Sequence, residues 1–141
     1  MSTKEKQEKP APQRSRLTAP FWEAAAQQKL LLQFDPATGR CQFYPRPLSL
    51  FSDSGKLEWK ESSGRGTLVA FTVVHSPAKG YENEAPYLAG IVRLDEGPRF
   101  FARIVNADAA SLRAGQRMRV AWATSLAAHP QRMPCVFEPG N

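Results

Sequence analysis

The feature that most constrains the fold is a series of short β-rich segments in the second half of the chain. Each is rich in β-branched and aromatic residues and is bounded by turn residues: 67–75, 88–94, 99–105, 118–123 and a return segment near Val136 and Phe137. The Asp95-Glu96-Gly97-Pro98 connection predicts a hairpin over 88–105, and a short helical turn is expected over 106–115. Such strands suit a five-stranded Greek-key barrel, which leaves few exposed sheet edges.

The first half of the chain has a different pattern. Thr18 as N-cap and Pro20 in the first turn predict a helix that runs to about Leu31, with an apolar stripe on one side. Residues 33–61 are irregular, with two turns on either side of a short strand and an extended Pro45-Arg46-Pro47. We therefore expect a mainly β chain with three parts: a basic tail at 1–16, a helix with an irregular segment at 17–62, and a barrel at 63–141.

Composition places the chain among ordinary globular proteins. Its 141 residues are 42% hydrophobic and 23% charged. No run approaches the roughly 20 apolar residues of a membrane helix, and the lysine-rich start has no apolar signal region, so we expect no membrane association and cytoplasmic residence. The two cysteines, Cys41 and Cys135, are too few for a disulfide framework and are expected to be reduced and buried.

The formal net charge of +6 is concentrated at the start of the chain. Residues 1–16 hold five Lys and Arg against two Glu, which accounts for half of the excess. This segment has prolines and glutamines but no aromatic residue, so we expect it to be disordered and its charge to be solubilising. The basic balance is therefore weak support for nucleic-acid binding.

Catalytic motifs are missing from the sequence. There is no Gly-x-Ser-x-Gly, no P-loop and no dinucleotide fingerprint. His75 at the end of a predicted strand and His129 in a late loop are typical of structural or exposed histidines. Asp95 and Glu96 lie side by side on a turn and are expected to face water rather than to form an acid–base pair. We expect no catalytic residue.

Several short motifs, none specific alone, occur together in a characteristic order. They are Phe21-Trp22-Glu23, Gln33, Gln42-Phe43, Pro45-Arg46-Pro47, Leu57-Glu58-Trp59, Ser63-Gly64-Arg65-Gly66-Thr67, Phe71-Thr72-Val73-Val74-His75, Pro86-Tyr87 and Leu94-Asp95-Glu96-Gly97-Pro98. Over residues 20–139 the chain resembles the family called domain of unknown function 35. The resemblance implies an N-terminal helix, a rubredoxin-like zinc ribbon and an OB-fold barrel, and a role as partner of thiolase-like or hydratase-like acyl-CoA enzymes.

The chain departs from the family at the zinc site. Family members place Cys-x-x-Cys on each of two turns, called knuckles, and the register of Gln33 and Pro45-Arg46-Pro47 puts other residues at those four positions: Asp35, Thr38, Ser49 and Ser52. Neutral hydroxyls do not replace thiolates around zinc, so we expect a ribbon remnant without metal. In place of the metal we expect a buried apolar plug of Phe34, Phe43, Tyr44, Leu48, Leu50, Phe51 and Trp59.

The resemblance also suggests two functional surfaces. Partner docking is expected at aromatic and rigid residues: Phe21, Trp22, Pro45, Arg46 and Pro47. The phosphates of coenzyme A are expected to bind at Arg65, Lys79, Arg93, Arg99 and Arg103. The coenzyme A thioester would be shared with the partner rather than bound tightly by this chain. Residue by residue, scattered solvated arginines explain these charges equally well.

Three functions stay open at this point. The first is a non-catalytic accessory subunit in a hetero-oligomer with a thiolase-fold or hydratase-type enzyme acting on acyl-CoA. The second is a stand-alone OB-fold that binds single-stranded nucleic acid or another anion. We disfavour nucleic acid, because at least half of the aromatic residues that could stack on bases are expected in the core: Phe71, Phe100, Phe101 and Trp122. A self-sufficient enzyme has the least support.

Overall fold

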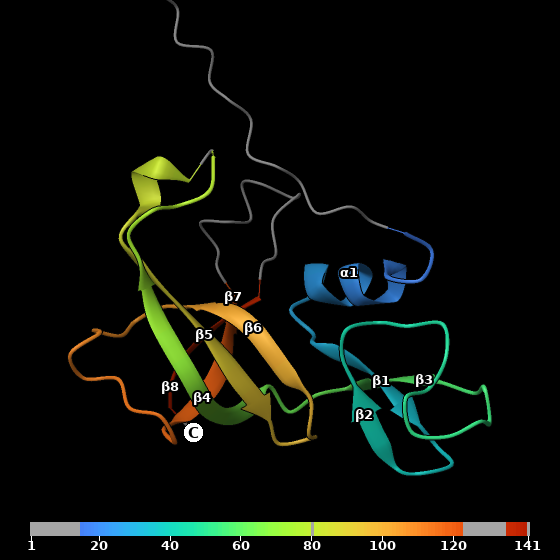
Figure 1. Ribbon diagram of the computed structural model, residues 1–141. Helices are drawn as coiled ribbons and strands as arrows, with labels where there is room; N and C mark the ends of the chain where they lie inside the picture. Colours follow the sequence, from blue (N-terminus) through green and yellow to red (C-terminus); the bar gives the residue numbers. More distant parts are fainter. Residues whose placement is uncertain (1–14, 80, 123–134, 141) are drawn as a thin grey trace, which may run out of the picture.

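The computed structural model describes residues 15–79, 81–122 and 135–140. A helix and a three-stranded sheet come first and a closed five-stranded barrel follows, and the two parts lie side by side (Figure 1). The first part contains α1 (Ala19–Ala26), β1 (Leu31–Asp35), β2 (Arg40–Gln42) and β3 (Glu58–Glu61). The barrel contains β4 (Arg65–Val74), the 3₁₀ helix η1 (Glu82–Glu84), β5 (Tyr87–Leu94), β6 (Arg99–Ile104), β7 (Arg117–Trp122) and β8 (Cys135–Pro139).

Helix α1 begins as expected but ends early. Thr18 is the N-cap and a proline stands in the first turn. The prediction that the helix continues to Leu31 is wrong, because Gln28 adopts a φ of 58° and the Lys29 N–H turns back to the Ala24 carbonyl at 2.9 Å. This ending frees Leu31–Asp35 to form β1.

Strand β1 is the centre of the small sheet. It pairs antiparallel with β2 through Gln33↔Gln42 and with β3 through Gln33↔Trp59. The expected short strand between two turns is β2, whereas the pattern of residues 33–61 did not predict β3. The ribbon-like part therefore keeps a regular sheet at its centre.

The barrel confirms the predicted fold class. Its strand order is β4-β5-β6-β8-β7, with β4 closing against β7. The hairpin predicted over 88–105 is β5 and β6, and the return strand is β8. Gly64, with φ +73°, is required at the start of β4, because a Cβ there would lie 2.3 Å from Val120 Cγ1. Residues 106–115 contain the expected single helical turn, in which the Ser111 and Leu112 amides donate to the Asp108 carbonyl at 3.0 and 3.1 Å.

One apolar core runs through both parts. The barrel interior is filled by side chains that are at most 1% exposed: Leu68, Val92, Leu94, Phe100, Met118 and Phe137. Phe43, from the segment after β2, stacks on Phe100 with ring centroids 4.6 Å apart and also meets Phe21 of α1 at 5.5 Å. The helix is therefore fixed to the barrel through Phe43.

Both cysteines are free and buried, as the sequence predicts. Burial raises the pKa of the Cys135 thiol to about 12, so this thiol stays protonated. The expectations for the tail up to residue 14 and for His129 lie outside the described residues. Within the described ranges, no helix combines the length and the apolar character needed to cross a membrane.

Candidate functional site

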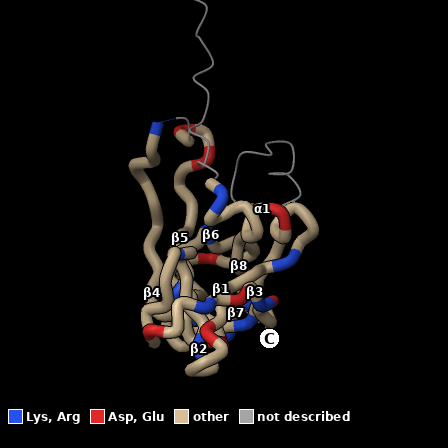
Figure 2. Tube along the Cα trace, turned by 90° about the vertical axis from the view of Figure 1, so that its right-hand side faces the viewer, with Lys and Arg blue, Asp and Glu red and all other residues tan. Residues whose placement is uncertain are grey.

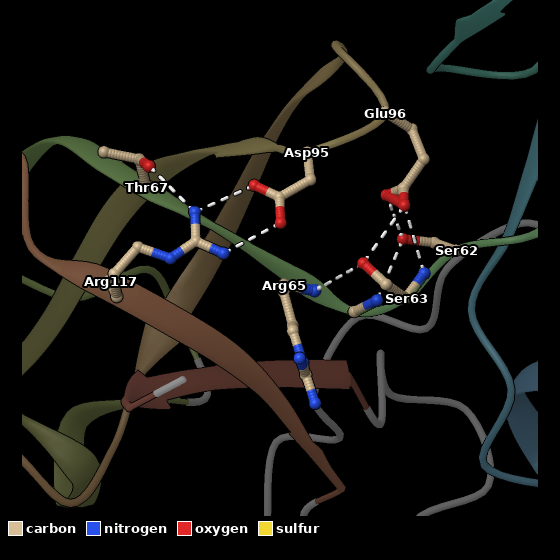
Figure 3. Close-up of polar contacts among 8 residues, drawn as sticks. Ser62, Ser63, Arg65, Thr67, Asp95, Glu96 and Arg117 are labelled. Carbon is tan, nitrogen blue, oxygen red and sulfur yellow. Dashed lines mark hydrogen bonds and ion pairs between the residues drawn. The ribbon is translucent and has the colours of Figure 1, made fainter.

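The two carboxylates of the β5–β6 turn point toward different partners (Figure 3). Asp95 forms a bidentate ion pair with Arg117 of β7, with both N–O distances 2.8 Å. Arg117 also donates to the Thr67 hydroxyl at 3.3 Å, and its hydrogen bonds lower the pKa of Asp95. The Asp95–Arg117 ion pair therefore connects the β5–β6 turn to β7 over the intervening strand β4.

Glu96 holds the segment that joins the small sheet to the barrel. It accepts hydrogen bonds from the Ser62 hydroxyl at 2.6 Å and from the Ser63 amide and hydroxyl at 3.1 Å (Figure 3). The Ser62 amide donates in turn to the Leu30 carbonyl at 2.8 Å. Asp95 is exposed, as expected, and Glu96 is half-buried, but each carboxylate is also bound to a defined protein partner.

Arg93 and Arg99 form the most distinctive charged feature of the barrel. They lie directly opposite each other on β5 and β6, and both are exposed. Thr67 of β4 pairs with Arg93 and with Arg117, so the four residues make one row across the sheet. Directly opposed like charges are unfavourable, and no carboxylate of the described residues forms an ion pair with Arg93 or Arg99. A bound anion would relieve this repulsion.

Of the other three basic residues predicted for phosphate binding, Arg65 lies diagonally across from Arg93 on the adjacent strand, whereas Arg103 and Lys79 lie apart from the pair. Arg103 lies 4.1 Å over the Tyr87 ring and 3.6 Å from Glu84, so its charge is already engaged. Lys79 is exposed in the β4–β5 connection, and Arg65 on β4 lies opposite Arg119 of β7. Basic positions are spread over several strands (Figure 2). The five basic residues predicted for phosphate binding therefore do not form one site, and the sequence spacing did not predict that Arg93 and Arg99 lie opposite each other.

Phe101 is an exposed aromatic residue between the arginines of β6. It is 60% exposed and lies opposite Ile91 of β5. Of the other aromatic residues considered for base stacking, Phe100 is buried, and Phe71 and Trp122 are partly buried against the core. Because successive bases need successive exposed rings, one such ring is a poor platform for a single strand.

Two buried glutamines hold the segment after β2, residues 43–54, which we call the knuckle loop. Gln33 and Gln42 are 4% and 3% exposed and are bonded to each other, Gln42 Nε2 to Gln33 Oε1, at 2.9 Å. The Gln33 amide binds both the N–H and the C=O of Arg46 at 2.8 Å, as a neighbouring strand would. Gln42 Oε1 accepts from the Leu50 amide at 2.9 Å. The loop backbone is thus bound to the sheet at Arg46 and at Leu50.

The side chains of the knuckle loop point largely to solvent. Tyr44, Leu48 and Leu50 are 54%, 66% and 58% exposed, so the prediction that these three belong to a buried plug is wrong. At Leu48 and Leu50 the Gln42 side chain binds the backbone, and the apolar side chains point away from the sheet. Phe34, Phe43 and Trp59 do pack against the core. The loop therefore presents apolar side chains on a held backbone.

The residues predicted to dock a partner lie in different environments. Arg46 and Pro47 are exposed and Pro45 is half-buried, all on the knuckle loop. Phe21 is 2% exposed and belongs to the core, which removes it from any docking surface of the free chain. Trp22 is half-buried and meets Phe21 edge-on at 5.3 Å. Sequence reasoning missed Tyr44, Leu48 and Leu50 as surface residues.

The four positions that correspond to zinc ligands come together at Asp35. Its side chain has no exposed surface, and one oxygen accepts hydrogen bonds from the Ser49 and Ser52 hydroxyls, both at 2.6 Å. The other oxygen accepts from the Ala37 amide at 2.8 Å. One carboxylate with neutral hydroxyls is not a donor set for structural zinc, so these residues do not fit the metal. In the part of the chain that is described, no three His, Cys, Asp or Glu residues come together.

Comparison with known proteins places this architecture in a family. Residues 59–123 match the family model described as the C-terminal OB-fold domain of ChsH2. A solved structure titled "Ltp2-ChsH2(DUF35) aldolase" superposes with a TM-score of 0.79 at 27% identity, covering 91% of this chain and 98% of that one. The chain belongs to the DUF35 family of OB-fold proteins.

DUF35 relatives extend from archaea to bacteria. A DUF35 domain-containing scaffold protein of Pyrococcus furiosus is 25% identical over 71% of this chain and 74% of its own length. The 3-oxo-4,17-pregnadiene-20-carboxyl-CoA hydratase alpha subunit of Mycobacterium tuberculosis is 32% identical over 79% of this chain, which spans only 35% of that relative. A DUF35 structure from Sulfolobus solfataricus, at 12% identity and a TM-score of 0.60, shares the fold.

Proposed function

We propose that this chain is a non-catalytic, cytoplasmic accessory subunit that forms a hetero-oligomer with a thiolase-like or hydratase-like enzyme acting on acyl-CoA. The names of its relatives support this function, since they include a scaffold protein, a CoA hydratase subunit and an aldolase assembly. The observation that carries the proposal is the knuckle loop, whose exposed apolar side chains stand on a backbone fixed by buried hydrogen bonds.

The docking surface in this proposal is centred on Tyr44, Leu48 and Leu50. Exposed apolar side chains at this density are typical of a surface that a partner covers. Because Gln33 and Gln42 already fix the loop, binding orders little new backbone, which lowers the entropic cost of association. Trp22, Pro45, Arg46 and Pro47 complete the proposed set.

Acyl-CoA in this proposal lies between the two proteins, with coenzyme A phosphates at the Arg93–Arg99 pair. Guanidinium groups bind phosphate oxygens through charge-assisted hydrogen bonds, and a phosphate between the two arginines would offset their repulsion. Arg65, two residues before Thr67 on β4, and Lys79, in the β4–β5 connection, contribute longer-range attraction. Because the pair is exposed, the thioester is shared with the partner rather than held tightly by this chain.

Replacing two exposed leucines of the loop with aspartate tests the docking proposal. The chain would be co-expressed with a thiolase-like or hydratase-like enzyme of its native host, and the affinity of the pair would be measured by calorimetry. The variant Leu48→Asp/Leu50→Asp should weaken binding by roughly a hundredfold, since two apolar anchors become charges. Leu17→Asp, at an exposed leucine outside the loop, is the matched control and should bind normally. Equal affinity for wild type and the loop variant would remove the proposed surface.

A further inference from the structure

The two turns that flank β2 are joined by one buried carboxylate. In the first turn, Asp35 accepts from the Ala37 amide through its side chain and from the Gly39 amide, at 2.8 Å, through its carbonyl. In the second turn, the Ser49 hydroxyl donates to Asp35 and accepts from the Phe51 amide at 3.0 Å. The same side chains therefore close each turn and connect it to the other.

The hydrogen-bond directions follow from the chemistry of the groups. An ionised carboxylate only accepts, so the Ser49 and Ser52 hydroxyls must donate to Asp35 and keep their lone pairs for backbone amides. Distances of 2.6 Å are typical of charge-assisted O–H···O⁻ bonds. The bonds from Ser49, then Ser52, lower the pKa of Asp35, so the buried group is an anion at neutral pH whose charge is compensated by donors.

From this geometry we infer that Asp35, Ser49 and Ser52 do the structural work of a metal ion: they cross-link the two turns around a single charged centre that is an anion instead of a cation. Zinc could not occupy this centre, because the hydroxyl protons point at the carboxylate and only one anionic ligand is present. The inference goes beyond the proposed function and holds whether or not the chain binds an enzyme.

The cross-link also positions the knuckle loop. Ser49 and Ser52 enclose Leu50, whose amide is bound by Gln42, so this part of the loop is held by two independent sets of buried or half-buried polar groups. Asp35 is accordingly a positioning residue. Its loss should release residues 49–52 while the barrel, which has its own core, stays folded.

Amide hydrogen exchange of the purified chain tests this directly. Asp35→Asn keeps the shape but removes the charge, and its NH₂ donor must face either the Ala37 amide or the two serine hydroxyls. The bonds from both serines therefore lose their charge assistance or break, and the amides of Phe51 and Ser52 should exchange roughly tenfold faster. Barrel amides such as that of Val92 should be unchanged. Asp53→Asn, at an exposed carboxylate of the same loop, is the matched control. Unchanged exchange at Phe51 and Ser52 in Asp35→Asn would overturn the inference.

Zinc content supplies a second, independent test. Wild-type chain grown with added zinc should contain far less than one zinc per chain, whereas the variant Asp35→Cys/Thr38→Cys/Ser49→Cys/Ser52→Cys should bind about one, because the four positions converge. Stoichiometric zinc in wild type would overturn the inference, as would a folded variant that binds none. If the variant does not fold, the exchange experiment decides alone.

Discussion

Glu96 accepts a hydrogen bond from the Ser62 hydroxyl at 2.6 Å across a sequence separation of 34 residues. Ser62 follows the last strand of the small sheet, and Glu96 stands at the tip of a barrel hairpin. This contact therefore sets the angle at which the small sheet, and with it the knuckle loop, leaves the barrel. It adds a polar connection to the apolar one made by Phe43 and Phe100.

Replacing Glu96 should weaken the connection between the small sheet and the barrel and lower the free energy of unfolding. Glu96→Ala leaves Ser62 and the Ser63 amide without their acceptor, and hydrogen bonds to a charged group contribute about 1.5–3 kcal/mol in such settings, so we expect a loss of about 1–2 kcal/mol in the free energy of unfolding. Urea titration measures it. Glu61→Ala, at an exposed glutamate of β3, is the control and should change stability little. Equal stability of both variants would show that the contact is incidental.

Replacing Gln33 should release the knuckle loop. Gln33→Ala leaves both backbone groups of Arg46 unpaired in a partly buried site and one donor of buried Gln42 without its acceptor, which typically costs about 1–3 kcal/mol. Exchange of the Arg46 amide should accelerate, and partner affinity should fall even though the apolar anchors are intact. Gln27→Ala, at an exposed glutamine after α1, should have neither effect. Full protection of Arg46 in the Gln33 variant would contradict this description of the loop.

Replacing the opposed arginines should separate stability from ligand binding. In Arg93→Ala/Arg99→Ala the like-charge repulsion disappears, so unfolding free energy should stay level or rise by roughly 0.2–1 kcal/mol. The assembled complex should bind acyl-CoA roughly tenfold more weakly. Arg16→Ala, at an exposed arginine before α1, serves as control.

The same double variant also addresses the nucleic-acid alternative. Titration of the wild-type chain with oligonucleotide at several salt concentrations should show weak binding. Tight binding that falls steeply with salt, and that is lost in Arg93→Ala/Arg99→Ala, would favour the nucleic-acid function instead.

The Asp95–Arg117 pair predicts a specific dependence on pH. Arg117 lowers the pKa of Asp95 in the folded chain, so the pair stabilises the fold above the unfolded pKa of about 3.9 and this contribution is lost as pH falls through the lower folded pKa. The difference in unfolding free energy between wild type and Asp95→Asn should be constant from pH 5 to 7 and shrink below about pH 4. Added salt should reduce it, because both side chains are partly exposed. A difference that grows on acidification would contradict the assignment.

The sequence predicted the barrel well because local signals suffice there. Alternating β-rich segments and the Asp95-Glu96-Gly97-Pro98 turn define β5 and β6, and the closing strands β7 and β8 follow from the same pattern. The small sheet was harder, since β3 is short and its burial pattern shows no alternation of buried and exposed residues. The end of α1 at Ala26 rests on the left-handed conformation of Gln28, which no local motif signals.

The candidate site depends on contacts between residues distant in sequence, which pattern reasoning does not supply. Leu48 and Leu50 have the sequence character of core residues, but the Gln42 side chain donates to the Leu48 carbonyl and accepts from the Leu50 amide, and both leucine side chains are exposed. Likewise, the sequence identified Asp35, Ser49 and Ser52 as ligand positions without a metal, but not the hydrogen bonds that connect them over separations of 14 and 17 residues. The exposure of Leu48 and Leu50 therefore follows from hydrogen bonds to their backbone, which the sequence pattern does not show.

The most direct measurement is the turnover of an acyl-CoA substrate by the purified chain alone, by its catalytic partner alone, and by the two together. An accessory subunit predicts no turnover by the chain alone, restored or increased turnover in the mixture, and no such gain with Leu48→Asp/Leu50→Asp. Turnover at enzymatic rates by the isolated chain, or full activity of the mixture with the loop variant, would contradict the account.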